Sequence, residues 1–503
     1  MDNNLFLEFK KHNPWHDSPN GSRLIMEQAS ELVRRENLFQ AIKKLNPSFV
    51  LNLEGPRRVG KSQLMRLMMA HLVSQENISP KQIIFINCEV GTTHTPHLID
   101  QLKEYCEEIY SRSFEEIKEK LFFFMDEVTQ IPDWEKKLKI EVDKKSLHQF
   151  VISSSSVIHL LKSKQSLVGR ISTVKILPFS FYEAIQLYKK MEIIPSISDT
   201  LEKLTSIAEP LRGSFSEASS KGIQFVYEKF QLLDERLNNL KEDLLIFGRR
   251  YLIEGGYPDF IRLRRTQPDY FTESIIPGVV YKDIASLFNL KPSSAEKIYQ
   301  LLYRLAYRNT KIVHLTDLKQ EIGETHAPRM SQYLHYLQSS QLLELLAPYG
   351  ENKILATKKG KRKIYFLDQG FVNQLTGILE KAFLELGLGI NETWEKIKGP
   401  AAETSVFQHL KRIGPNWKTS YYRDEDETKD IDFMWETSLG VIPIECKMRR
   451  RPLDRETTDR ILKVMERKKT SFALVTTESE LSLRANKILC IPLYYFLGVQ
   501  DVG

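Results

Sequence analysis

Cysteine is scarce in this chain of 503 residues, which contains only four. Cys88, Cys106, Cys446 and Cys490 lie far apart and follow no metal-ligand spacing, so we expect neither a zinc site nor a disulfide framework. Four separated cysteines are typical of buried thiols in a reducing compartment.

Long apolar runs are absent too. No window approaches 18 uncharged apolar residues, so no membrane-spanning helix is predicted. The first residues lack the basic-then-apolar pattern of a secretory signal. We therefore expect a cytoplasmic protein without a membrane partner.

A large excess of charge of either sign is also missing, because the formal net charge is only +7. This balance permits nucleic acid as a partner without requiring it. Hydrophobic residues make up 42% of the chain and charged residues 27%, which argues against global disorder. The length exceeds that of one hydrophobic core, so about two to four domains are expected.

Residues 1–190 are predicted to form an α/β domain with a parallel sheet. An amphipathic helix is expected over 24–45, with Arg34 and Arg35 exposed, and another over 63–71. Apolar runs separated by helical stretches indicate strands covered by helices on both faces. These runs lie at 49–53, 83–86, 121–125 and 150–152.

Three further regions are predicted after this domain. Residues 191–245 form a helical insertion without identifiable chemistry. Residues 246–395 are mostly helical, and the order of three helices and then two short strands indicates a winged helix; these elements are expected at 299–307, 315–322, 330–346, 353–356 and 363–366. Residues 396–503 form an α/β domain with elements at 401–412, 418–423, 430–437, 440–447, 454–468 and 471–476.

A phosphate-binding loop of the pattern G-x-x-x-x-G-K-[ST] lies between the first predicted strand and the helix that follows it. It consists of Gly55, Pro56, Arg57, Arg58, Val59, Gly60, Lys61 and Ser62. Its backbone N–H groups and the helix N-terminus favour phosphate; Lys61 is expected to contact the β- and γ-phosphates of ATP, and Ser62 to bind Mg²⁺. A chance match is disfavoured because strand and helix flank the motif.

Asp126 and Glu127 follow the apolar run 121–125. Ligands bind beyond the carboxyl ends of strands in parallel sheets. We expect Asp126 to hold Mg²⁺ and Glu127 to polarise the attacking water. A solvated turn is the usual fate of such an acidic pair, but the complete phosphate loop favours the functional interpretation.

These motifs resemble those of the archaeal-type P-loop ATPases of the AAA superfamily. Further landmarks follow in family order at 132–135, 139, 153–156, 167–170, 177–183, 254–258, 282–284 and 363–370. The resemblance implies ATP hydrolysis and a C-terminal domain of restriction-endonuclease-like fold. Residues 152–156 read Ile-Ser-Ser-Ser-Ser where the family has a glycine, which affects the expected geometry for sensing the γ-phosphate. Gln63 stands where the family often has threonine.

Arg170 has two interpretations. It is a candidate arginine sensor or finger that stabilises negative charge on the γ-phosphate. The alternative is a surface arginine at a helix end.

A second set of polar residues lies in the C-terminal region: Glu403, Asp432, Glu445 and Lys447. Period-2 geometry places Glu445 and Lys447 on one face of a strand. The set looks like the D…(E/D)-x-K signature of restriction-endonuclease-like nucleases. Glu403, Asp432 and Glu445 are expected to hold Mg²⁺ beside a scissile phosphate, with Lys447 orienting the water. Such domains also survive as scaffolds that have lost catalysis.

Two basic clusters are candidate phosphate contacts for DNA. One is the run 358–363, in the turn of the predicted winged helix, and the other comprises Lys447, Arg449, Arg450 and Arg451. Solvated charge runs are the simpler interpretation of both.

Two functions therefore remain open. The preferred one is an ATP-hydrolysing, DNA-associated protein whose nuclease-like domain cleaves DNA with Mg²⁺. The alternative is a regulatory ATPase switch that acts through protein partners and carries a catalytically silent scaffold. A helicase is disfavoured because no second motor core is visible, and the sequence leaves open whether the chain forms a homo-oligomer.

Overall fold

The computed structural model describes residues 3–89, 97–154, 167–191, 213–263, 271–350, 361–387, 391–424, 430–438, 440–449 and 451–499. They fall into two compact units. The first comprises Met1–Ile176 with Ser339–Gln341, and the second Leu177–Gln338 with Leu342–Gly503. The sequence placed the first boundary near residue 190, whereas the first unit ends at Ile176.

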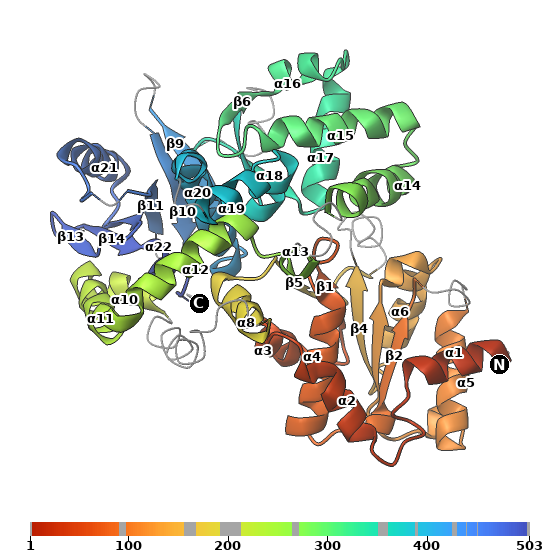
Figure 1. The fold of residues 1–503 in the computed structure, drawn as a ribbon. Helices are drawn as coiled ribbons and strands as arrows, with labels where there is room; N and C mark the ends of the chain where they lie inside the picture. The colour runs from red at the N-terminus through yellow and green to blue at the C-terminus, as the bar shows by residue number, and fades with distance from the viewer. Residues whose placement is uncertain are drawn as a thin grey trace. The chain divides into compact units, whose positions relative to one another are not determined.

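The first unit contains five parallel strands and helices on both faces of their sheet (Figure 1). The strands are β1 (Val50–Glu54), β2 (Ile83–Asn87), β3 (Phe122–Asp126), β4 (Gln149–Ser154) and β5 (Ile171–Lys175). The helices are α1 (Asn3–His12), α2 (Gly21–Ser30), α3 (Leu38–Lys43), α4 (Lys61–Gln75), α5 (Leu98–Tyr110) and α6 (Trp134–Asp143).

The strand order is β2-β3-β4-β1-β5. The four predicted strands are present, and β5 is an addition that the polar sequence Ile-Ser-Thr-Val-Lys did not reveal. Strand β4 lies between β1, which leads into the phosphate loop, and β3, which ends in Asp126. Because all five strands are parallel, these carboxyl ends meet at one edge of the sheet.

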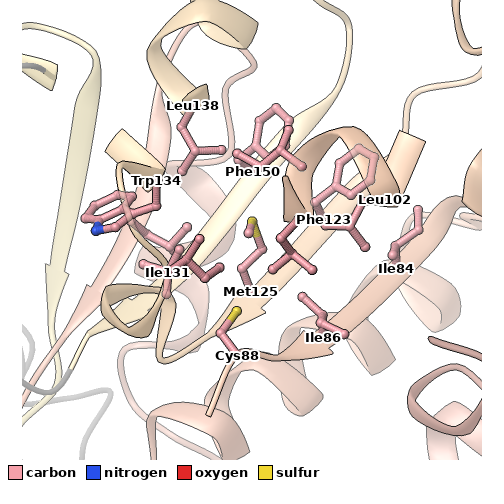
Figure 2. Close-up of a cluster of buried hydrophobic side chains, with 14 of the residues drawn as sticks. Ile84, Ile86, Cys88, Leu102, Phe123, Met125, Ile131, Trp134, Leu138 and Phe150 are labelled. Carbon is pink, nitrogen blue, oxygen red and sulfur yellow. The ribbon is translucent and has the colours of Figure 1, made fainter. Parts of the chain in front are cut away.

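Alternate side chains of the strands enter two separate cores, which is why the strands read as continuous apolar runs. One core is drawn in Figure 2, where side chains from β2, β3 and β4 meet α5 and the segment from Ile131 through α6. Its labelled members are Ile84, Ile86, Cys88, Leu102, Phe123, Met125, Ile131, Trp134, Leu138 and Phe150. The opposite face packs on α2, α3 and α4 through a second cluster.

The single helix expected over 24–45 is wrong. Helix α2 ends at Ser30 and α3 begins at Leu38. Arg34 is exposed as expected, but Arg35 is buried, and its guanidinium donates to the carbonyl of Val59 at 3.1 Å. The break between the helices is what allows Arg35 to turn inward.

Helices of the second unit surround two sheets. They are α8 (Phe181–Lys190), α10 (Ser214–Lys221), α11 (Ile223–Arg236), α12 (Lys241–Glu254), α13 (Pro258–Leu263), the π-helical η6 (Phe271–Ile275) and η7 (Gly278–Ile284), α14 (Ala285–Phe288), α15 (Pro292–Ala306), α16 (Leu315–Glu321), α17 (Ala327–Ser339), α18 (Gln369–Leu375), α19 (Leu379–Gly387), α20 (Glu392–Ile413), α21 (Arg455–Lys468) and α22 (Leu493–Phe496).

The smaller sheet has the order β6-β8-β7 and is antiparallel. Its strands are β6 (Ile312–His314), β7 (Leu343–Leu346) and β8 (Lys361–Phe366). The helix expected over 330–346 ends at Ser339, because the chain turns with Gln341 in the left-handed region and then pairs as β7. The strand expected over 353–356 lies outside the described residues.

The larger sheet has the order β13-β14-β12-β11-β10-β9. Strands β9 (Lys418–Arg423), β10 (Asp430–Thr437) and β11 (Gly440–Lys447) confirm the predicted ranges. Strand β12 (Ala473–Thr477) is close to its prediction, while β13 (Ser482–Arg484) and β14 (Ile488–Pro492) were not foreseen. Helix α21 packs on one face of this sheet.

The two sheets share contacts, so the predicted domains at 246–395 and 396–503 lie in one compact unit. Tyr349 N–H donates to the Tyr421 carbonyl at 2.7 Å, and Tyr421 N–H to the Ala347 carbonyl at 3.2 Å. The ring of Tyr365 on β8 lies 4.7 Å from that of Phe407 on α20 and 5.1 Å from that of Phe433 on β10. These contacts fix β8 against the larger sheet.

Three of the family landmarks meet at a junction in this unit. The Asp368 carboxylate accepts the N–H groups of Gly256 at 2.6 Å and Phe371 at 2.9 Å, so it caps α18. Gly256 also packs so closely that an added Cβ would lie 2.3 Å from the carbonyl oxygen of Phe179. The landmarks at 177–183, 254–258 and 363–370 therefore have a structural role.

Candidate functional site

The phosphate loop begins where β1 ends. An added Cβ at Gly55 would lie 2.3 Å from the carbonyl oxygen of Ile176, so the close approach of the chain after β5 requires glycine there. Gly60 has a φ of +96° and directly precedes α4. The loop therefore leads directly into the N-terminus of a 15-residue helix, and such a helix N-terminus favours phosphate.

Lys61 is buried at the first position of α4. Its ammonium donates to the carbonyls of Gly55 and Pro56, both at 3.1 Å, and lies 3.5 Å from a Glu127 oxygen. Two of these three partners are neutral. The ammonium charge is therefore available to an anion in the loop.

Asp126 lies at the end of β3 and is buried. Its carboxylate accepts a hydrogen bond from Ser153 at 2.5 Å and interacts with the side chain of Ser62. Burial raises its pKa, against the opposing effect of these hydrogen bonds and of Lys61. The Ser62 hydroxyl and the Asp126 carboxylate thus lie together, and hard oxygen donors of this kind fit Mg²⁺.

Glu127 adopts a left-handed backbone conformation, with a φ of +53°. Its N–H donates to the Ser153 hydroxyl at 2.8 Å, so Ser153 bridges Glu127 and Asp126. This serine is the first of the run that the sequence associated with the γ-phosphate, and it lies at the site. Ser155 and Ser156 lie outside the described residues.

The loop arginines differ in their surroundings. Arg57 donates to Glu89 at 3.0 Å, and Arg58 is exposed with a φ of +64°. Pro56 and Val59 are buried and support the loop from below. Arg35, whose guanidinium holds the Val59 carbonyl, is a residue that the sequence analysis missed. No motif pointed to it, because its role depends on the break between α2 and α3.

Arg170 lies at the amino-terminal ends of the strands, whereas the phosphate loop lies at their carboxyl-terminal ends. It directly precedes β5, and Ile171 pairs with Val50 at the start of β1, whereas the loop follows Glu54. Four strand residues separate these ends, roughly 13 Å along the strand. The guanidinium is paired with Asp143 and donates to the Val168 carbonyl at 3.1 Å. Within one chain, Arg170 therefore does not reach the phosphate loop.

The C-terminal polar residues also come together, around a lysine that the sequence analysis assigned to a basic turn. The Lys363 ammonium lies 2.6 Å from a Glu403 oxygen and 2.9 Å from a carboxylate oxygen of Asp432. Tyr365 donates its hydroxyl to the same Glu403 oxygen. Burial raises the pKa of Glu403, as does the Asp432 charge. The pKa of Asp432 is lowered, because Lys363 and the Cys446 N–H outweigh its burial.

Glu445 has its own two cations. One of its oxygens lies 2.7 Å from the Lys447 ammonium and 2.5 Å from the Arg460 guanidinium, which comes from α21. Burial and the Asp432 charge raise the pKa of Glu445. Arg460 is a second participant that sequence reasoning missed, since it lies in a helix with no recognisable motif.

The described residues contain no group of three or more histidine, cysteine, aspartate or glutamate side chains arranged to hold a metal ion. In the phosphate loop this agrees with a site in which protein and nucleotide oxygens share the ion. In the C-terminal cluster, Lys363 lies between two of the three expected carboxylate ligands. The set there does not fit Mg²⁺ while this lysine is in place.

The predicted basic clusters are only partly exposed. Arg362 and Lys363 are buried in β8, so these two residues do not belong to an exposed basic turn, contrary to the prediction for the run 358–363. A buried ammonium needs paired acceptors, and Lys363 finds them in Glu403 and Asp432. Arg449 pairs with Asp454 at 2.5 Å. Lys358, Lys359, Gly360 and Arg450 lie outside the described residues.

A comparison with known protein families agrees with the assignment of the phosphate loop as a nucleotide site. Residues 48–185 match the family described as "AAA domain". This match and the phosphate-loop geometry define an AAA-type P-loop ATPase domain. Residues 248–382 and 398–496 match two domains of unknown function, DUF8612 and DUF4143.

Two solved structures illustrate the similarity, and both are distant in sequence. The Walker-type ATPase PABY2304 of Pyrococcus abyssi is 13% identical, with a TM-score of 0.37, over 69% of this chain and 94% of that one. The ORC1 protein of Aeropyrum pernix in complex with DNA is 14% identical, with a TM-score of 0.26, over 74% and 97%. No curated protein matches the chain. None of the helices in the described ranges is long and apolar enough to cross a membrane.

Proposed function

We propose that the first unit binds and hydrolyses ATP at the phosphate loop, with Mg²⁺ held by Ser62 and Asp126. The observation that carries this proposal is the Lys61 ammonium, buried in the loop and bound mainly by neutral carbonyls. Lys61 exchanges these carbonyls for the β- and γ-phosphates. Glu127 orients the attacking water, and Ser153 holds the Asp126 carboxylate and the main chain of Glu127. Bound Mg²⁺ neutralises charge on the phosphate oxygens.

Isothermal titration calorimetry with ATP and Mg²⁺ tests the proposal, together with phosphate release. Lys61→Ala is expected to abolish detectable binding. Lys144→Ala is the matched control, because this lysine is exposed at the C-terminal end of α6. Unchanged ATP affinity in Lys61→Ala, with the fold intact by circular dichroism, would contradict the assignment.

Arg170 has a role in hydrolysis only from a second copy of the chain, because its own loop lies at the other end of the strands. In a homo-oligomer it serves as a finger in the neighbouring site; otherwise its bond to Asp143 is structural. Mixing Arg170→Ala with an excess of Lys61→Ala distinguishes these roles. If Arg170→Ala alone loses ATP turnover and mixing restores it, Arg170 acts as a finger in the neighbouring site. If Arg170→Ala alone keeps full turnover, this role is rejected.

The second unit is proposed to bind DNA through a winged helix formed by α15, β6, α16, α17, β7 and β8. Two observations support this: the element order, and the exposed polar residues of α17, which are Arg329, Ser331, Gln332 and His335. Such side chains contact phosphates and base edges when a helix enters the major groove.

Fluorescence anisotropy with a labelled duplex tests this part. Arg329→Ala is expected to weaken binding and to reduce its salt dependence by roughly one phosphate contact. Lys381→Ala on α19 is the control, because this lysine is equally exposed and lies outside the proposed winged helix. Equal binding by all three proteins would remove α17 from the DNA interface.

For the C-terminal sheet, the ion pairs of Lys363 favour the silent scaffold over DNA cleavage with Mg²⁺. Cleavage by Glu403, Asp432, Glu445 and Lys447 would require a metal ion among carboxylates that already hold protein cations. Plasmid nicking in the presence of Mg²⁺ tests this choice. Nicking that Asp432→Ala abolishes would restore the nuclease hypothesis.

A further inference from the structure

The C-terminal cluster already contains cations of the protein. Glu403, Asp432 and Glu445 pair with Lys363, Lys447 and Arg460, and Arg460 also pairs with the exposed carboxylate of Asp430. A divalent ion stabilises a carboxylate cluster mainly by cancelling repulsion among its members. Here the protein's own cations already do so.

Five of the six oxygens of these three carboxylates also lie beside donors in the described residues. Asp432 binds Lys363 with one oxygen and the Cys446 N–H with the other, at 3.0 Å. One Glu403 oxygen is shared by Lys363 and Tyr365. One Glu445 oxygen binds Lys447 and Arg460, and the other accepts the Asp432 N–H at 3.4 Å. A metal ion would have to break several of these bonds to gain ligands.

Lys363 lies where such an ion would bind. Its ammonium is within 3 Å of both Glu403 and Asp432, and Mg²⁺ would need to approach the same oxygens to about 2.1 Å. Two cations cannot occupy this space together, because their repulsion in a buried site is large. The lysine side chain is only 8% exposed, so the ammonium has little access to water as an alternative partner.

The backbone of Lys363 is fixed as well. Lys363 pairs with Ile312 of β6 and Leu346 of β7, in the middle strand of the smaller sheet. Two residues on, the Tyr365 ring packs on Phe407 and Phe433. Withdrawing the ammonium therefore means moving β8 away from α20 and β10.

We propose that Lys363 is the resident cation of this cluster: it takes the place of a divalent ion and joins β8 to α20 and β10. The cluster is then an ionic joint between the smaller and larger sheets that excludes divalent cations. The inference does not depend on ATP binding, because every residue in it belongs to the second unit, whereas the phosphate loop belongs to the first.

Mn²⁺ titration of the nucleotide-free, full-length protein tests the proposal, with free Mn²⁺ measured by electron paramagnetic resonance. Wild type and Asp432→Asn are expected to bind the same amount of Mn²⁺, because the cluster of the wild type holds none. Lys363→Met keeps the length of the side chain without its charge and is expected to gain about one Mn²⁺ per chain. Adding Asp432→Asn to Lys363→Met should abolish that gain.

Lys411→Met is the matched control, because Lys411 is a half-buried lysine of α20 that pairs with one carboxylate, Glu344, at 2.6 Å. It should gain no Mn²⁺ site. If Lys363→Met does not fold, the double variant Glu403→Gln/Lys363→Met replaces it in the titration, because it leaves fewer carboxylates without a partner. It is expected to bind Mn²⁺ through Asp432 and Glu445.

Two results would overturn the proposal. One is an Mn²⁺ site in wild type that Asp432→Asn eliminates. The other is a folded Lys363 variant, single or double, that binds no more Mn²⁺ than wild type. Unchanged ATP binding in Lys61→Ala, which would contradict the proposed ATP site, would affect neither result, because the two measurements concern different units.

Discussion

The phosphate loop and the C-terminal cluster each combine a buried lysine with acidic side chains, yet the two lysines have different partners. Lys61 is held by two main-chain carbonyls at 3.1 Å, with a carboxylate 3.5 Å away. Lys363 is held by two carboxylates at 2.6 and 2.9 Å. The first ammonium can exchange weak neutral partners for phosphate, whereas the second is neutralised by the fold itself.

The comparison teaches that the surroundings of a charged residue decide whether it serves a ligand or the fold. The pairing of an ammonium with a carboxylate adds the attraction of two full charges to the hydrogen bond, and a neutral carbonyl lacks this attraction. A buried cation with two carboxylate partners therefore stabilises the fold, and an incoming anion competes poorly for it. A cation resting on carbonyls is open to a stronger acceptor.

The largest effect is expected on the rate of ATP hydrolysis when one acidic residue of each site is replaced. Glu127→Gln should lower the rate of ATP hydrolysis by about 10²- to 10⁴-fold, because loss of a positioned base costs this much, while ATP affinity changes little. Phosphate release and calorimetry measure the two quantities. Glu445→Gln should leave both unchanged. An equal loss in the two variants would mean that the C-terminal cluster participates in ATP turnover.

A smaller difference is expected between the two buried lysines in their contribution to the free energy of unfolding. Lys363→Met should lower the free energy of unfolding by about 3–5 kcal/mol, because it leaves buried carboxylates without a partner. Lys61→Met should change it by roughly 1 kcal/mol, since carbonyl groups lose less than carboxylates. Urea unfolding of the nucleotide-free protein measures both. The contrast between the sites would fail if Lys61→Met proved as destabilising as Lys363→Met.

The smallest effect concerns acid stability of the unit that carries the phosphate loop. Burial lowers the pKa of His16 to about 4, and its ring binds Tyr105 at 3.0 Å and the Ile83 carbonyl at 2.8 Å. Above pH 6.5 the imidazole is neutral in both the folded and unfolded states, so it has no effect on the pH dependence of stability. As pH falls from 6.5 towards 4, the unfolded state gains a proton that the folded state does not, and stability is lost.

The loss attributable to His16 is about 3 kcal/mol over this range. His16→Gln should reduce the pH dependence of unfolding by about this amount, as measured in urea with the fluorescence of the adjacent Trp15. His97→Gln is the control for the loss of an imidazole elsewhere in the unit, because His97 is exposed. A His16 variant with the same acid sensitivity as wild type would show that its ring is protonated within the fold.

Sequence reasoning located the phosphate loop, Asp126 and Glu127, because their signals are local: a motif between a strand and a helix, and an acidic pair after an apolar run. It also placed β9, β10 and β11 correctly, since alternation and turns mark half-buried antiparallel strands. It missed β5, whose polar residues resemble a loop, and extended the helix of α17 into β7. Pairing partners distant in the chain decide both cases.

The roles of individual charged residues were harder to predict. Arg35 looked like an exposed helix residue and is buried beside Val59. Lys363 looked like part of a basic turn and is enclosed by Glu403 and Asp432, which follow it by 40 and 69 residues. Arg460 carried no signal at all. Nothing within a window of neighbouring residues distinguishes these side chains from solvated ones.

By itself, the sequence determined that the chain carries a phosphate loop with its acidic partners, because a glycine-bounded loop, a lysine and a strand-end carboxylate have this chemistry wherever they fold together. Only the tertiary structure decided what the other charges do. In the folded chain, Arg170 lies at the end of the sheet opposite its own phosphate loop, and Lys363 lies between two carboxylates. The reason is physical: the energy of a charge depends on distance and burial, and both are properties of the folded chain.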